Sequence, residues 1–298
     1  MSGSKNSFRG IIPAVITPFT EKKETDHEGL SVTLKGLLEH GITGFLINGS
    51  TGEAATLTRE ERSENIRSAS MIAKGRAKVL AGVGSPSTTQ AIQYAKDAQE
   101  AGADAVVALT PYDIIPNKEG LLEYYREIAK SVKVPVIAYN LPQHTGVNLG
   151  VDTLVKLVND GVVMGIKESS GNLANLAQMI KEVGEKISIL TGSDDLTLQS
   201  FVMGCSGAIL ALGNLAPKLC VDMFDSVQRG DFGRAKELYY KVLPLAQGIG
   251  SPENFPAPIK EALKIQGKPA GPCRSPVVPV STMEKEQIRK ALEHAGLV

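Results

Sequence analysis

The chain repeats one pattern eight times: a short apolar segment, a polar loop and a segment with the periodicity of an amphipathic helix. Short apolar segments bounded by turn residues are typical of strands that are buried on both faces. Strands that alternate with helices form a parallel sheet. Eight such units fit a (β/α)8 TIM barrel, which takes roughly 200–250 residues. The eight apolar segments are 10–16, 44–47, 79–83, 105–109, 135–139, 162–166, 187–190 and 208–212.

The competing fold for such a pattern is an open, doubly wound sheet. That fold usually has fewer strands and carries a glycine-rich fingerprint directly after the first one. In this chain Pro18-Phe19-Thr20 follows the first strand instead. The sequence therefore favours the α/β class and, within it, the (β/α)8 TIM barrel.

The pattern changes after residue 230. Segments 231–245, 257–265 and 284–294 have helical periodicity, and loops rich in proline and glycine separate them without any further strand. We therefore expect a barrel catalytic domain over residues 1–230 and a C-terminal helical domain over residues 231–298. The helical extension would pack on the outside of the barrel or on a partner chain.

Charge, cysteine content and hydropathy limit which binding partners and which cellular location we expect. Lys+Arg and Asp+Glu both number 32, so bulk charge predicts binding to neither nucleic acid nor an anionic membrane. The three cysteines, Cys205, Cys220 and Cys273, have neither metal-ligand spacing nor an even count that could pair fully. No apolar run is long enough to span a bilayer, and none follows the polar N-terminus as a signal region would. We expect a soluble, cytoplasmic protein.

Lys167 stands at the end of the sixth apolar segment, where a charge is out of place. A buried lysine pairs with an anion, extends to water or loses its proton, and the unprotonated amine is a nucleophile towards carbonyl groups. Taken alone, the position is better explained by a lysine that extends to water. The location favours chemistry, however, because TIM barrels place their active sites at the carboxyl ends of the strands.

Other polar residues collect at the same ends of the predicted strands. Ser50 and Thr51, in a glycine-flanked turn, could hold a small carboxylate or could simply cap a helix. Tyr139 could relay protons to Lys167 from the neighbouring strand or could be a core aromatic. Asp194 and Asp195 are most often helix caps, and a lone histidine is most often a loop residue. The remaining residues of this group are Asp113, His144 and Ser169.

These residues predict imine chemistry. A lysine amine attacks a ketone and loses water, and the resulting iminium withdraws electrons so that a neighbouring carbon–carbon bond can form or break. A carboxylate cradle beside the amine selects 2-keto acids, of which pyruvate is the smallest, and a tyrosine can move the protons. Such a cycle needs no cofactor. His144 has no second histidine or cysteine at ligand spacing, so we expect no catalytic metal.

The chain resembles the pyruvate-dependent class I aldolase family of dihydrodipicolinate synthase and N-acetylneuraminate lyase from about residue 10 to its end. The resemblance lies in GSTGEA (49–54), TPY (110–112), YNLP (139–142), GIKESSG (165–171) and GSDD (192–195), which occur in the family's order. It implies Lys167 as the Schiff-base residue, Tyr139 as the proton relay, and Ser50 and Thr51 as the site for the pyruvate carboxylate. It also implies that Ile209 lines the pocket and that the protein is a homotetramer, a dimer of dimers.

Two departures from this resemblance concern the second substrate. Dihydrodipicolinate synthases that resemble this chain carry an arginine where His144 stands, and it grips the carboxylate of the aldehyde. They place a second tyrosine where Asp113 stands, and that tyrosine is lent across the dimer interface to the proton relay. Neither replacement is conservative, because histidine offers no bidentate fork and aspartate no phenolic proton. Ser169, Asp194 and Asp195 suit the hydroxyls of a polyol chain instead.

The sequence thus predicts a Schiff-base lyase or aldolase that cleaves or forms a 2-keto-3-deoxy or 4-hydroxy-2-keto acid from pyruvate and an aldehyde. Two alternatives keep the imine: 4-hydroxy-tetrahydrodipicolinate (dihydrodipicolinate) synthesis, and dehydration of a keto-deoxy sugar acid. A third alternative is a catalytically silent barrel that binds keto acids. The expected partners are a small keto acid and an aldehyde, with no nucleic acid and no membrane.

Overall fold

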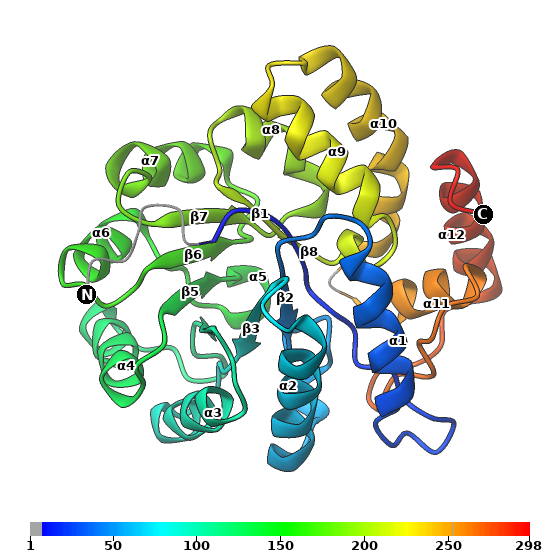
Figure 1. Ribbon diagram of the computed structural model, residues 1–298. Coiled ribbons are helices and arrows are strands. Elements are labelled where there is room, and N and C mark those ends of the chain that lie inside the picture. The colour runs from blue at the N-terminus through cyan, green and yellow to red at the C-terminus, as the bar shows by residue number, and fades with distance from the viewer. Residues whose placement is uncertain (1–7, 252) are drawn as a thin grey trace.

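Eight parallel strands form a barrel in the computed structural model, which describes residues 8–251 and 253–298 (Figure 1). The hydrogen-bonded order is β1-β8-β7-β6-β5-β4-β3-β2. The barrel closes between β1 and β2, where Val15 N–H donates to Leu46 O over 2.9 Å and Thr43 N–H donates to Ile11 O over 2.9 Å. The strands are β1 (Gly10–Pro13), β2 (Gly44–Ile47), β3 (Lys78–Gly82), β4 (Ala105–Leu109), β5 (Val136–Asn140), β6 (Gly165–Glu168), β7 (Ser188–Thr191) and β8 (Gly207–Leu210). The prediction of a (β/α)8 barrel is confirmed.

Helices surround the strands as an outer ring (Figure 1). Capping side chains close in sequence fix where several of these helices begin. Thr58 and Glu61 form a capping box at the start of α2, and Asn117 accepts a hydrogen bond from Gly120 N–H at the start of α4. The ring consists of α1 (His27–Leu38), α2 (Arg59–Ala73), α3 (Thr88–Glu100), α4 (Lys118–Ser131), α6 (Val151–Asn159), α7 (Leu173–Val183), α8 (Thr197–Val202) and α9 (Pro217–Gln228). Short turns of helix lie at the barrel mouth: η1 (Ala54–Thr56), α5 (Pro142–Thr145), η2 (Asp194–Leu196) and η3 (Leu212–Asn214).

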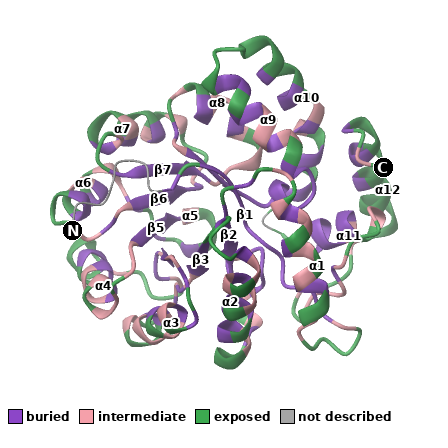
Figure 2. Ribbon diagram, viewed as in Figure 1, coloured by how far each residue is buried: buried purple, intermediate pink, exposed green. Residues whose placement is uncertain are grey.

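The core has two parts, which Figure 2 shows as buried strands inside helices whose outer faces are exposed. Side chains such as Leu46, Leu80 and Leu190 fill the barrel interior. A larger cluster fills the space between the strands and the surrounding helices. Both faces of every strand are therefore buried, which explains why the strands appear in the sequence as apolar segments rather than as alternating patterns.

The C-terminal extension consists of α10 (Phe232–Ile249), α11 (Ala257–Ile265) and α12 (Thr282–His294). Helix α10 packs against α9 and α12. It continues about one turn beyond the predicted end at residue 245, because Ala246 and Ile249 are buried and extend its apolar face. This last turn brings the extension to the barrel mouth. Within the described part of the chain, no helix is both long and apolar enough to cross a membrane.

Strand β6 lies later in the chain than the predicted 162–166. Its hydrogen-bonded register with β5 starts at Gly165 and runs through Glu168. Lys167 is therefore inside the strand rather than just after it, and its partner in the register is Tyr139. Periodicity could not locate this shift, because a strand's ends depend on where its neighbours offer hydrogen-bonding groups.

Candidate functional site

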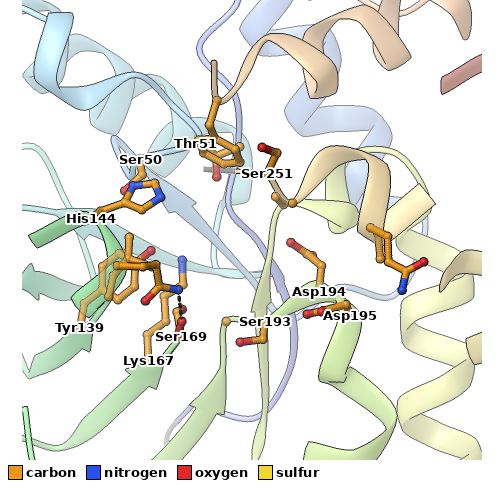
Figure 3. Close-up of a pocket in the computed structure, with 18 residues that line it drawn as sticks. Ser50, Thr51, Tyr139, His144, Lys167, Ser169, Ser193, Asp194, Asp195 and Ser251 are labelled. Atoms are coloured by element: carbon orange, nitrogen blue, oxygen red, sulfur yellow. Dashed lines mark hydrogen bonds between the residues drawn. The ribbon is translucent and has the colours of Figure 1, made fainter. Parts of the chain in front are cut away.

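A cavity of about 390 Å³ opens at the carboxyl ends of the strands and is shown in Figure 3. Parallel strands bring their polar terminal residues to this one end. Eight of the ten residues predicted from the sequence line the cavity: Ser50, Thr51, Tyr139, His144, Lys167, Ser169, Asp194 and Asp195. Ile209 and Asp113 are not among its lining residues.

Lys167 lies on the floor of the cavity and is 5% exposed. Its Nζ atom is 4.2 Å from the centroid of the Tyr139 ring, across the β5–β6 register. Directly after β7, Gly192 leaves room for the lysine, since a Cβ atom there would lie 2.6 Å from Lys167 Cε and would collide with Ser169 Oγ. The amine therefore lies beside an aromatic ring, and the lysine lines the cavity.

Glu168 follows the lysine in sequence but belongs to a different environment. Side chains alternate along a strand, so adjacent residues point to opposite faces. Glu168 accepts hydrogen bonds from the Asn140 amide over 2.8 Å and from Ser170 N–H over 2.7 Å. These bonds tie the ends of β5 and β6 together and fix the strand that carries the lysine.

Ser50 and Thr51 lie on the turn between β2 and η1. The turn is held against the segment that follows β1, because the Thr17 hydroxyl donates to Gly52 O over 2.7 Å. It ends at Glu53, which is buried with a left-handed φ of 54°. Figure 3 shows Ser50 and Thr51 at the rim of the cavity above Lys167. Two hydroxyl groups and a tight turn are suited to a small carboxylate.

Asp194 and Asp195 form the opposite wall (Figure 3). Asp194 Oδ1 accepts a hydrogen bond from Leu212 N–H over 2.8 Å. Burial raises the pKa of Asp194 to about 6, against the lowering effects of that hydrogen bond and of the Lys167 charge. The carbonyl of Asp195 accepts a bond from the Tyr239 hydroxyl over 2.7 Å, which ties this wall to α10.

Ser169 offers an unused hydroxyl to the cavity. Its carbonyl accepts a hydrogen bond from the Gln143 amide over 2.6 Å, drawn in Figure 3. Its Oγ atom is buried and has no hydrogen-bond partner among the described residues. A buried hydroxyl without a partner is costly, so this atom is available to a polar group of a bound molecule.

His144 lines the rim from α5, and its ring meets that of Phe255 edge-on with centroids 6.4 Å apart. Burial lowers the pKa of His144, so the ring is neutral at pH 7. The only other basic side chain on the cavity wall, among the described residues, is Lys167. The described part of the wall therefore contains no guanidinium to grip a second carboxylate.

Two predicted residues lie elsewhere. Ile209, on β8, is fully buried in the barrel interior in the same apolar cluster as Tyr139. Asp113 is exposed, in the loop after β4, and has a left-handed φ of 70°. It lies beside Ile114 and Ile115, which are 63% and 69% exposed.

Sequence reasoning missed five polar or aromatic lining residues. Two of them could have been found, because they lie in loops that already contained predicted residues. The other three come from the helical extension, where no local pattern pointed to the cavity. The five are Gln143 and Ser193, and Gln247, Ser251 and Phe255.

No three His, Cys, Asp or Glu side chains in residues 8–251 and 253–298 are grouped so that they could hold a metal ion.

Comparisons with known proteins agree with this architecture. The model of the dihydrodipicolinate synthetase family matches residues 7–295. The 4-hydroxy-tetrahydrodipicolinate synthase of Methanocaldococcus jannaschii is 37% identical over 292 residues, which cover 98% of this chain and all of that protein. That of Methanothrix thermoacetophila is 37% identical over 286 residues, 96% of each chain.

Solved structures give the same result. A dihydrodipicolinate synthase from Aquifex aeolicus superposes with a TM-score of 0.93 at 34% identity and covers 97% of this chain and 99% of its own. A chloride-inhibited dihydrodipicolinate synthase from Acinetobacter baumannii, complexed with pyruvate, has a TM-score of 0.94 at 33% identity with the same coverage. The protein is an enzyme of the class I aldolase type, and the chain belongs to the dihydrodipicolinate synthetase family.

Proposed function

We propose that the protein is a pyruvate-dependent aldolase that forms a Schiff base on Lys167. The observation that carries the proposal is the arrangement of three groups around one cavity. An amine on β6 lies beside the Tyr139 ring, and the hydroxyls of Ser50 and Thr51 lie at the rim. Each group fits one part of pyruvate or one step of its activation.

The covalent cycle follows from these positions. The Lys167 amine attacks C2 of pyruvate, and loss of water gives an iminium. Loss of a C3 proton gives an enamine, whose C3 atom attacks the aldehyde carbon and forms a carbon–carbon bond. The new alkoxide takes up a proton, and water hydrolyses the iminium to release the 4-hydroxy-2-keto acid and the amine. Tyr139, the register partner of Lys167, would carry the protons.

The aldehyde would be neutral and hydroxylated. Asp194 and Asp195 line one wall, and Ser169 offers a hydroxyl without a partner in the described structure. Carboxylates repel an anionic substrate and accept hydrogen bonds from hydroxyls. A neutral His144 adds no positive charge.

Trapping with borohydride tests the imine. Incubation with pyruvate and borohydride would reduce the iminium to a stable secondary amine on the peptide that contains Lys167, which mass spectrometry detects. Lys167→Ala serves as the control and would give no adduct. An adduct on another lysine, or none on the unaltered protein, would overturn the proposal.

Synthesis of 4-hydroxy-tetrahydrodipicolinate is the second candidate function. It is favoured by relatives of that name that are 37% identical over nearly the whole chain. The two candidates share the imine and differ in the aldehyde. Assays with aspartate semialdehyde beside neutral hydroxylated aldehydes separate them, since a higher kcat/KM for the semialdehyde would establish the synthase.

We also propose a homotetramer, built as a dimer of dimers. Support comes from the exposed pair Ile114 and Ile115, because large apolar residues that adjoin on a surface often mark a contact between chains. Asp113 would lie at the same contact. Light scattering after size-exclusion chromatography measures the mass, and a monomer at micromolar concentration would contradict this assembly.

A further inference from the structure

A buried ion pair joins the helical extension to the turn that carries Ser50 and Thr51. Lys260 Nζ of α11 lies 2.6 Å from Glu53 Oε1, and both side chains are only 2% exposed. The same Nζ atom donates to Pro272 O over 2.9 Å and lies 4.1 Å from the centroid of the Phe19 ring. The lysine is therefore fixed by three contacts outside the cavity.

Stability alone gives little reason for this pair. Removing two charges from water is costly, and apolar replacements of buried pairs are often neutral or stabilising. Burial lowers the pKa of Lys260, against the opposing attraction of Glu53. What the pair supplies is a fixed distance and direction between two segments that are far apart in sequence.

Glu53 is the last residue of the turn and holds it in place. Glu53 immediately precedes η1 and has a left-handed φ of 54°. Its second oxygen, Oε2, accepts a hydrogen bond from Arg274 N–H over 2.8 Å. The extension thus binds both oxygens of this carboxylate.

Arg274 binds the other end of η1. Its guanidinium donates to Thr56 O over 2.8 Å and to Glu61 Oε2 over 2.8 Å. The segment before it lies directly on the barrel, because Gly271 has a φ of 65° and a Cβ atom there would collide with Phe19 O. Both ends of η1 are therefore fixed by residues of the extension.

We propose that Lys260 is a positioning residue, which acts through Glu53 to set the Ser50–Thr51 turn for the carboxylate of a 2-keto acid. This rests on the proposed function, because it takes that turn as the carboxylate site. The lysine does not line the catalytic cavity, so it acts without touching the substrate. The extension then controls affinity for the carboxylate.

The expected defect is selective. Lys167 is held by the β5–β6–β7 register, whereas the contacts of Lys260 described above are with Glu53, Pro272 and Phe19. Loss of Lys260 would therefore weaken capture of the carboxylate and leave the amine reactive. A ketone without a carboxylate, such as acetone, would be unaffected.

The test measures the concentration dependence of borohydride trapping with pyruvate and, separately, with acetone. Lys260→Met should raise the half-saturating pyruvate concentration by about 10- to 100-fold, since a misplacement of about 1 Å can cost up to about 100-fold, and leave acetone trapping unchanged. Lys285→Met is the matched control, because Lys285 pairs over 2.5 Å with Glu261, the neighbour of Lys260 in α11. It should behave as the unaltered protein. If Lys260→Met does not fold by circular dichroism, the double variant Glu53→Gln/Lys260→Met, which removes both buried charges, takes its place.

The outcomes separate this inference from the proposed function. Failure of the unaltered protein to trap pyruvate on Lys167 overturns the function and the inference with it. Trapping by the unaltered protein and an unchanged half-saturating concentration in the folded variant overturn the positioning role alone. An equal loss with pyruvate and acetone also overturns it, because that result indicates a general disturbance of the site.

Discussion

Tyr139 and Lys167 are register partners on neighbouring parallel strands, and Nζ of the lysine lies 4.2 Å from the centroid of the tyrosine ring. The pairing is fixed by backbone hydrogen bonds rather than by a contact between the side chains. The tyrosine can therefore be altered without displacing the lysine.

Tyr139→Phe should reduce the rate of imine formation by about 100-fold or more, because proton transfer by a positioned side chain contributes that much. The half-saturating concentration of pyruvate should change little, since the carboxylate cradle is intact. Rapid-quench trapping with borohydride measures both quantities. Tyr124→Phe is the control, because that buried hydroxyl donates to Leu109 O over 3.0 Å and accepts a bond from Ser85 N–H over 3.4 Å, two partners that belong to β4 and to the loop after β3. Equal rates in the two variants would exclude Tyr139 as the relay.

Gly192→Ala should impair trapping on Lys167. The added methyl group would collide with Ser169 Oγ and approach Lys167 Cε, so the amine must move. Gly36→Ala is the control: a Cβ atom at that helical position meets nothing within 4 Å and should stabilise the protein by about 0.5–1 kcal/mol. Trapping yield and thermal unfolding are measured for both. A fully active Gly192→Ala variant would mean that the lysine does not depend on this space.

His144→Arg should shift the choice of aldehyde. A guanidinium at the rim would give the cavity a second cation that can bind a carboxylate. The ratio of kcat/KM for aspartate semialdehyde to that for a neutral hydroxyaldehyde should rise by about tenfold, corresponding to about 1.4 kcal/mol. His294→Arg, on the exposed face of α12, adds the same charge at a distance and should leave the ratio unchanged. No difference between the two variants would argue against His144 as a determinant of specificity.

Asp194→Asn should change how stability depends on pH. The pKa of Asp194 is raised to about 6 in the folded protein, whereas it stays near its ordinary value of about 3.9 when unfolded. The folded state then binds more protons between these values, so the Asp194 contribution to stability is lost as pH rises from about 4 to 6. Asparagine does not ionise. Denaturant unfolding measures the free energy of unfolding of both proteins. The value for the variant minus that for the unaltered protein should be larger at pH 7 than at pH 4. An equal difference at the two pH values would contradict the raised pKa.

Arg274→Met should change the pH dependence of stability in the opposite direction and at lower pH. The Arg274 hydrogen bond is the main cause that lowers the pKa of Glu61 to about 2. Its contribution is present above the ordinary glutamate pKa of about 4.3 and is lost as pH falls towards 2. The variant should lose about 2 kcal/mol at pH 7 and show a shallower decline on acidification. Lys130→Met removes an exposed pair with Glu127 and should leave stability almost unchanged, because water screens an exposed pair.

The outer framework of this protein could be predicted from its sequence. Each strand buries both faces and each helix buries one, so strands appear in the sequence as apolar runs and helices as segments with helical periodicity. The caps formed by Thr58 and Asn117 are local in the same way, because each side chain binds a backbone N–H three residues further along the chain. The order of the strands also placed Tyr139 next to Lys167, because consecutive strands of such a barrel are neighbours.

The completed cavity could not be predicted in the same way. Gln247 reaches the cavity because α10 continues one turn further, and Ser251 and Phe255 line it from beyond the end of that helix. In sequence they resemble any loop after a surface helix. The Ser169 hydroxyl, which has no partner within residues 8–251 and 253–298, likewise depends on what surrounds it.

The sequence by itself therefore determined the barrel, the end of it that carries the polar residues, and the lysine. The tertiary structure decided what encloses that lysine and what holds the turn beside it. Arg274 and Glu53 are 221 residues apart, and a lysine at position 260 has the same local pattern as one that faces water. Periodicity reports which face of an element is buried, whereas the partner of a buried charge is set by the packing of distant segments.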